Sequence, residues 1–189
     1  MTSGDFVYSN DTCSAFLAAI VRSFEENHPR GYLGRTAVQK LAYFAKAMGV
    51  PIPCSFDIYT YGPYSDTVTF SMESLMADDV VVDHSHKPDY SSYKLGENAA
   101  ELLRAFDGEI RPYTSAIDQV VKALGGFKPQ ELELIATLHF IARRLRQVHH
   151  RDEPSKPEVI SEFISIKGDK FGHEEINIWY DALKKAGLI

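Results

Sequence analysis

Two short runs of polar and aromatic residues are the part of this 189-residue sequence best equipped for chemistry. The first, QKLAYFA at residues 39–45, lies on a predicted helix and presents an amide, a cation and a phenol within about one turn: Gln39, Lys40 and Tyr43. The second combines aromatic rings with turn residues: Tyr61, Gly62, Pro63 and Tyr64. Because Gly-Pro does not continue a helix, the second run is predicted to be extended. The helix either grips this extended backbone or lines a surface pocket for a partner or ligand.

A second candidate binding surface is a row of cations on a predicted helix near residue 140. Arg143 and Arg146 share a helical face with His139 and His150, at i, i+4, i+7 and i+11. The opposite face carries a predicted apolar stripe: Leu138, Ile141, Leu145 and Val148. The cationic face is therefore either solvated or the docking surface for an acidic protein partner.

Metal and catalytic chemistry are not expected. His84 and His86 alternate on a predicted strand beside Asp83, and His149 and His150 precede Asp152, but neither spacing fits a known metal site. The sequence also lacks the GxSxG, HExxH, P-loop and dinucleotide-binding patterns. We therefore predict no catalytic residues, no metal and no cofactor, and a protein that is not an enzyme.

Nucleic-acid binding has one argument for it and one against it. Tyr59, Tyr61 and Tyr64 could stack on bases, although tyrosines at the rim of a core are more common. The predicted helix 65–77 contains two acids and no Arg or Lys, and two further acids follow it. Since cations supply most of the affinity for phosphates, we do not expect this helix to bind nucleic acid.

The composition is that of an ordinary globular protein. Hydrophobic residues make up 44% and charged residues 24%, which excludes wholesale disorder. The net charge of −6 is unevenly spread: residues 28–56 contain four cations and no carboxylate, residues 57–83 six carboxylates and no cation, and residues 139–151 four arginines and no acid. No membrane-spanning or signal segment is evident, so a soluble cytoplasmic protein with two reduced cysteines is expected.

The predicted fold is mainly α: a winged-helix-like unit with a small antiparallel β-hairpin, followed by a C-terminal helical half. Helices are predicted from a cap at residue 10 or 11, from Thr36 and from Ser65. Strand-like segments at 80–83 and 92–95 form the wing, and a further helix runs from 96 to 106. The later helices are expected at 112–124, from Pro129, from Pro157 and around Trp179. We divide the chain into halves 1–108 and 109–189, packed as one compact domain.

The order and spacing of QKLAYFA and YGPYS resemble the signature of the Panacea, or SocA-like antitoxin, family and of its YwgA-like relatives. The segment YKLGE at residues 93–97 stands where that pattern has it. The resemblance implies a non-catalytic antitoxin-like or adaptor regulator that binds a protein partner directly, such as a cognate toxin, and it implies no catalytic residues. The alternative is a winged-helix transcription regulator that binds DNA, and a more distant one is a small hydrolase.

Overall fold

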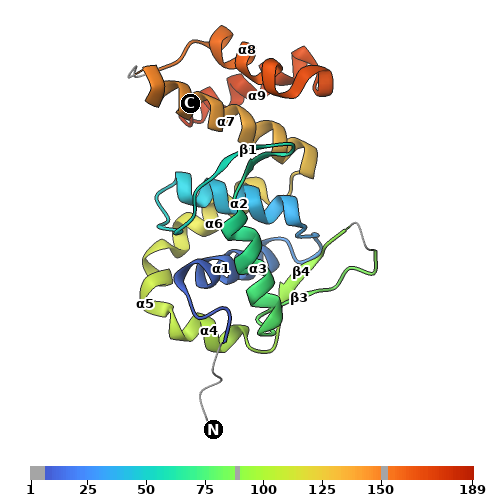
Figure 1. The fold of residues 1–189 in the computed structure, drawn as a ribbon, viewed down its shortest axis with the longest axis vertical. Coiled ribbons are helices and arrows are strands. Elements are labelled where there is room, and N and C mark those ends of the chain that lie inside the picture. Colours follow the sequence, from blue (N-terminus) through green and yellow to red (C-terminus); the bar gives the residue numbers. More distant parts are fainter. Residues whose placement is uncertain (1–6, 88–89, 150–152) are drawn as a thin grey trace. The chain divides into compact units, whose positions relative to one another are not determined.

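The chain is mainly helical with two small β-hairpins in a computed structural model that describes residues 7–87, 90–149 and 153–189 (Figure 1). This confirms the predicted fold class. The helices are α1 (Thr12–Asn27), α2 (Arg35–Ala47), α3 (Asp66–Ala77), α4 (Ala99–Ala105), α5 (Asp107–Ile110), α6 (Thr114–Leu124), α7 (Pro129–His149), α8 (Lys156–Lys167) and α9 (His173–Lys185). The strands are β1 (Asp57–Tyr59), β2 (Gly62–Tyr64), β3 (Val81–Asp83) and β4 (Tyr93–Leu95).

The chain divides into two compact units, and the division differs from the one expected. Unit 1 comprises residues 1–56 and 64–127, and unit 2 comprises residues 57–63 and 128–189. Residues 109–127, which we assigned to the C-terminal half, thus belong with unit 1, and the short segment 57–63 belongs with unit 2. The packing of both halves as one domain stays a prediction.

Unit 1 is built around α1. This helix starts at Asp11, whose carboxylate accepts a hydrogen bond of 3.0 Å from the Ser14 amide, and it ends at His28. Every residue of α1 from Cys13 to Val21 is buried, and the helix contacts α2, α3, α4 and α6. The predicted apolar stripe is confirmed as core: Phe16, Leu17, Ile20, Val21 and Phe24.

The wing is confirmed. Strands β3 and β4 pair antiparallel with Val82 opposite Lys94; β3 contacts α3, and β4 contacts α1 (Figure 1). Gly96, which follows β4, has no room for a side chain, because a Cβ there would lie 2.1 Å from the Asp79 carbonyl oxygen. Asp79 itself adopts a positive φ of 52° at the turn that leads into the wing. Close packing thus dictates a glycine at the base of the wing.

Two predicted helix caps need correction. Helix α2 starts at Arg35 with Gly34 as its N-cap, so Thr36, the expected cap, lies inside the first turn. Ser65 does occupy the N-cap position of α3, but its side chain makes no capping hydrogen bond.

Helix α7 is the longest helix described in unit 2. Its burial differs from the predicted pattern of an apolar face opposite a cationic face. All residues from Leu132 to His139 are buried, and α7 contacts α8 and α9. The expectation that His139 belongs to an open cationic face is therefore wrong: its exposed fraction is 3%. Val148, expected in the core, is 65% exposed. An apolar stripe along one face is expected only where the opposite face is in solvent. Helix α7 is buried on every face from residue 132 to 139 and is more exposed near its C-terminal end, so one stripe does not run along its whole length.

No helix in the described ranges has both the length and the apolar character required to cross a bilayer. Cys13 and Cys54 are free thiols in unit 1. Burial raises the pKa of both, to about 11 for Cys54, which keeps that thiol protonated at neutral pH.

Candidate functional site

Gln39 on α2 holds the backbone of Ser65 in unit 1. The Ser65 amide donates to the Gln39 Oε1 atom at 2.9 Å, and the Gln39 Nε2 atom donates to the Ser65 carbonyl at 2.9 Å and to the Thr69 hydroxyl at 3.0 Å. The side-chain amide therefore pairs with Ser65 as a neighbouring β-strand would. We call this contact the glutamine lock. It is the predicted grip of the helix on the extended run.

The other predicted residues of unit 1 are also part of the fold. The Tyr64 hydroxyl lies 2.7 Å from the Thr69 hydroxyl, so Tyr64 joins the same network. Tyr43 is 5% exposed, and its ring meets that of Phe56 edge-on with centroids 5.4 Å apart. Lys40 is 1% exposed. A surface pocket needs accessible groups, so the geometry favours the structural interpretation for these residues, and their binding role stays a prediction.

The hairpin β1–β2 carries two accessible aromatic residues of the second run and its surroundings, Tyr59 and Tyr61. Its two strands are joined by Thr60 and Tyr61, and Gly62 takes the positive φ of 84° that the turn requires. Gly62 and Pro63 are buried, whereas Tyr59 and Tyr61 are 54% and 61% exposed. Of the predicted motif, it is therefore Tyr61 that reaches the surface, together with Tyr59.

An ion cluster that is buried on its inner side contacts this hairpin in unit 2. Glu133 of α7 accepts hydrogen bonds from Lys167 at 2.9 Å and from Lys170 through both carboxylate oxygens at 2.8 Å. Lys167 also donates to the Thr60 carbonyl at 2.7 Å, and the Lys170 ammonium lies 4.9 Å from the centre of the Tyr61 ring. We call the side chains of Glu133, Lys167 and Lys170 the lysine clamp.

Sequence reasoning missed the lysine clamp. Its one local signal is the acid Glu133 inside a stretch that is otherwise apolar or weakly polar, from Leu132 to Thr137. An acid is rarely buried unless it is paired, so that position could have indicated an ion pair. Its partners were not deducible, because they lie 34 and 37 residues away.

The cationic row on α7 is shorter than predicted. Arg143 is exposed, and Arg146 is half-buried with its Nε atom covered and without a hydrogen-bond partner in the described part of the chain. Burial, followed by the charges of these two arginines, lowers the pKa of His139 to about 4, so the imidazole is neutral at pH 7. His150 lies outside the described residues. Of the predicted members that the structure describes, His139 is buried, and Arg143 and Arg146 remain candidates for this face.

Among the described residues, no metal-binding cluster surrounds the wing histidines His84 and His86. His84 and His86 are exposed, and no group of three or more His, Cys, Asp or Glu side chains within the described ranges could hold a metal ion. The Asp83 carboxylate instead accepts from the Ser85 and Ser92 amides at 2.9 and 2.8 Å. Burial alone would raise the pKa of Asp83, but these hydrogen bonds outweigh it and lower the pKa. The pair His150 and Asp152 lies outside the described residues.

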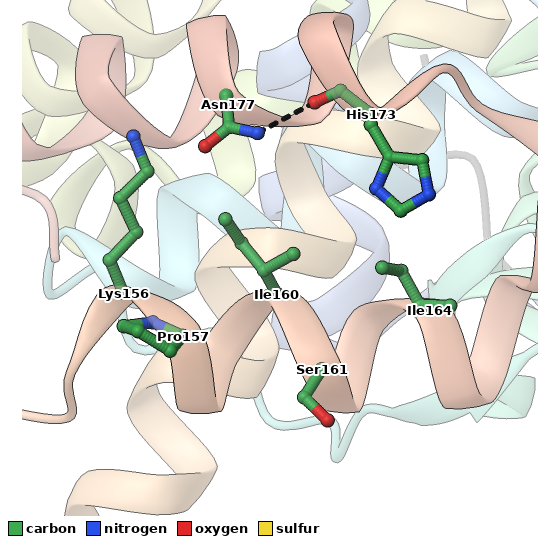
Figure 2. A pocket seen from close by; sticks show the side chains of 7 residues that line it. All are labelled: Lys156, Pro157, Ile160, Ser161, Ile164, His173 and Asn177. Atoms are coloured by element: carbon green, nitrogen blue, oxygen red, sulfur yellow. Dashed lines mark hydrogen bonds between the residues drawn. The ribbon is translucent and has the colours of Figure 1, made fainter.

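An open groove of about 550 Å³ runs between α8 and α9 (Figure 2). Ile160 and Ile164 line it from α8, and His173 and Asn177 face them from α9. The Asn177 amide donates to the His173 carbonyl at 2.8 Å. The α8 side of the groove is thus apolar, and the side-chain N–H of Asn177 is used in the hydrogen bond to His173.

Comparison with known proteins gives three partial similarities. No family model matches the sequence. The chain is 30% identical over 109 residues to YwgA of Bacillus subtilis, an uncharacterized protein, covering 56% of this chain and 63% of YwgA. It is 28% identical over 115 residues to the DNA ADP-ribosyl glycohydrolases of Mycobacterium bovis and Mycobacterium tuberculosis, covering 57% of this chain and 32% of each of those proteins.

The chain thus spans about a third of the mycobacterial proteins and less than two thirds of YwgA. The similarity to YwgA supports the YwgA-like part of the resemblance noted in the sequence. The finer resemblance to the Panacea, or SocA-like antitoxin, family stays a prediction.

Proposed function

We propose that this chain is a non-catalytic cytoplasmic regulator that binds another protein directly, as an antitoxin-like or adaptor module. The observation that carries the proposal is the β1–β2 hairpin, on which Tyr59 and Tyr61 are more than half exposed while Lys167 holds the turn between them. Tyrosine is enriched in protein interfaces because it offers a large contact area and a hydrogen-bonding group at low entropic cost. A hairpin held in one shape loses little entropy when it binds.

Support for a non-catalytic role comes from the state of the motif residues. The amide of Gln39 is engaged at both ends by Ser65 and Thr69. Lys40 is buried, and Tyr43 packs against aromatic rings. Groups that acid, base or nucleophilic chemistry would need in the open are thus part of the protein interior.

The antitoxin-like role rests on the motif resemblance and on the similarity to YwgA. The corresponding partner is a cognate toxin. The glycohydrolase activity named for the mycobacterial relatives belongs to proteins of which this chain spans about a third, so we do not transfer it.

Co-expression tests the proposal. The protein encoded beside this gene is expressed alone and together with the wild-type chain or with Tyr61→Ala. We expect growth arrest by the neighbour alone, relief by the wild type, and no relief by Tyr61→Ala. Tyr32→Ala is the matched control, because Tyr32 is 83% exposed in unit 1 and its substitution should preserve relief. A harmless neighbour, or relief by Tyr61→Ala equal to that by the wild type, would contradict the antitoxin-like role through this hairpin.

A DNA-binding regulator is the second candidate, since the order helix, hairpin, helix is that of a winged-helix domain. The outer face of α3 argues against it, because Asp66 and Glu73 are exposed there together with Phe70. Titration with random duplex DNA at low salt decides between the two. Submicromolar binding with a steep salt dependence would favour the regulator.

A further inference from the structure

The β1–β2 hairpin is too short to hold its own shape. Each strand has three residues, and an isolated two-stranded hairpin is marginally stable at best in water. The conformation of the Thr60–Tyr61 turn must therefore come from contacts outside the hairpin. Two such contacts in unit 2 come from the lysine clamp: Lys167 binds the Thr60 carbonyl, and the Lys170 ammonium lies over the Tyr61 ring.

Lys167 is the inner member of the clamp. Its side chain and that of Glu133 are each 3% exposed, and its ammonium bridges the Glu133 carboxylate and the Thr60 carbonyl. Hydrogen bonds from a charged donor are stronger than neutral ones, and they are stronger still away from water. Lys167 thus holds the backbone of the Thr60–Tyr61 turn through its hydrogen bond to the Thr60 carbonyl.

Lys170 is the outer member. Its side chain is 37% exposed, and its ammonium lies between the Glu133 carboxylate and the face of the Tyr61 ring. Two ammonium groups share one carboxylate in the clamp, which leaves one surplus positive charge. Lys170 is the clamp member that water can reach, so the surplus charge comes to the surface beside an exposed tyrosine.

We propose that Tyr59, Tyr61 and Lys170 form a surface that binds an acidic segment of the partner protein, with Lys167 and Glu133 as its positioning residues. This inference rests on the proposed function and names the chemistry of the partner. A carboxylate of the partner would complete the charge balance of the clamp at Lys170, while the tyrosine rings and hydroxyls supply apolar contact and hydrogen bonds. The phosphates of a single-stranded nucleic acid are the competing anion, which the test distinguishes.

A labelled peptide of eight glutamates is the probe, and fluorescence anisotropy on the purified chain is the measurement. We expect Lys170→Met to weaken binding by at least about fivefold and Lys170→Arg, which keeps the charge over the ring, to stay within about twofold of the wild type. Lys185→Met is the control, an exposed lysine of α9 in the same unit, and should bind as the wild type does. A twelve-residue oligothymidine should bind more weakly than the peptide.

Unchanged peptide binding in Lys170→Met, an equal loss in Lys185→Met, or tighter binding of the oligothymidine would each overturn the acidic-partner surface. The assay requires no toxin. Failure of growth rescue together with peptide binding would reject the proposed function alone, and growth rescue without peptide binding would reject this inference alone.

Backbone NMR relaxation tests the positioning role. In the wild type, the order parameters of Thr60 and Tyr61 should reach about 0.85, the value of rigid backbone, and in Lys167→Met they should fall below about 0.6 while peptide affinity drops. Lys167→Arg, which keeps a charged donor, should restore both. If Lys167→Met does not fold, the wild type decides, because order parameters below about 0.6 there would show that nothing clamps the turn.

Discussion

The glutamine lock and the lysine clamp hold the same stretch of chain by different physical means. In unit 1, the neutral Gln39 amide matches the donor and the acceptor of Ser65. In unit 2, a salt-bridged cluster holds the Thr60 carbonyl five residues earlier. The first contact replaces hydrogen bonds to water with equivalent ones, whereas the second removes charged groups from water and depends on their mutual pairing.

The difference shows how sensitive each contact is to the loss of one member. A neutral amide that is lost leaves two polar backbone groups without partners, which is a moderate cost. A carboxylate that is lost leaves two ammonium groups, one of them almost fully buried, without a counter-charge. The clamp should therefore fail more severely than the lock, although both make short, well-formed hydrogen bonds.

The largest expected effect is that of Glu133→Gln. Because it leaves Lys167 buried beside a neutral group, it should lower the free energy of unfolding by about 3–5 kcal/mol, measured by urea denaturation. Glu175→Gln, at an exposed position in the first turn of α9, is the control and should cost less than about 1 kcal/mol. A loss in Glu133→Gln no larger than that of the control would break the comparison.

Acid pH probes the second titratable group buried in α7. The pKa of His139 is about 4 in the folded chain, below its ordinary value of 6.5, so the unfolded chain binds a proton first. Stability is therefore fully present above pH 6.5 and is lost as the pH falls towards 4, by about 3 kcal/mol in all.

Urea denaturation at pH 7, 6 and 5 measures this slope. His139→Gln should flatten it, and His173→Gln, at an exposed position, should leave it as in the wild type. If the wild type and His139→Gln lose stability equally between pH 7 and 5, His139 does not remain neutral in the folded state. Unit 2 would then tolerate charge at this position.

Gln39→Ala measures the lock. It leaves the amide and the carbonyl of the buried Ser65 without Gln39, so we expect a loss of about 1–3 kcal/mol in the free energy of unfolding, smaller than that of Glu133→Gln. Gln119→Ala, on the exposed side of α6, should stay within about 0.5 kcal/mol of the wild type. If Gln39→Ala lowers the free energy of unfolding as much as Glu133→Gln does, the neutral glutamine lock is as sensitive as the ionic lysine clamp, and the comparison is wrong.

The wing is a region where we expect histidine substitutions to have no effect on stability. His84 and His86 are exposed and neither lock nor clamp involves them, so the double substitution to alanine should leave the melting temperature unchanged, with or without zinc. A zinc-dependent rise of several degrees in the wild type that the double variant lacks would reveal a metal site there.

Local signals in the sequence determined a large part of this fold. The cap at Asp11, the breaker Gly62-Pro63, Pro129 at the start of α7 and the β-branched run before Asp83 each act on their immediate neighbours, and the corresponding elements are present. The motif spacing also left two alternatives for the Gln39 helix, a grip on the extended run or a surface pocket, and the hydrogen bonds between Gln39 and Ser65 correspond to the grip.

Only the tertiary structure decided which polar groups are buried and what they pair with. Lys167 meets Thr60 across 107 residues of chain, and His139 is buried although its helical neighbours Arg143 and Arg146 indicated a solvated face. The division into units also follows packing, since the segment 57–63 belongs with helices that come 65 or more residues later. Periodicity reports one face of one helix, whereas burial on all sides and pairing of distant charges depend on which elements pack around it.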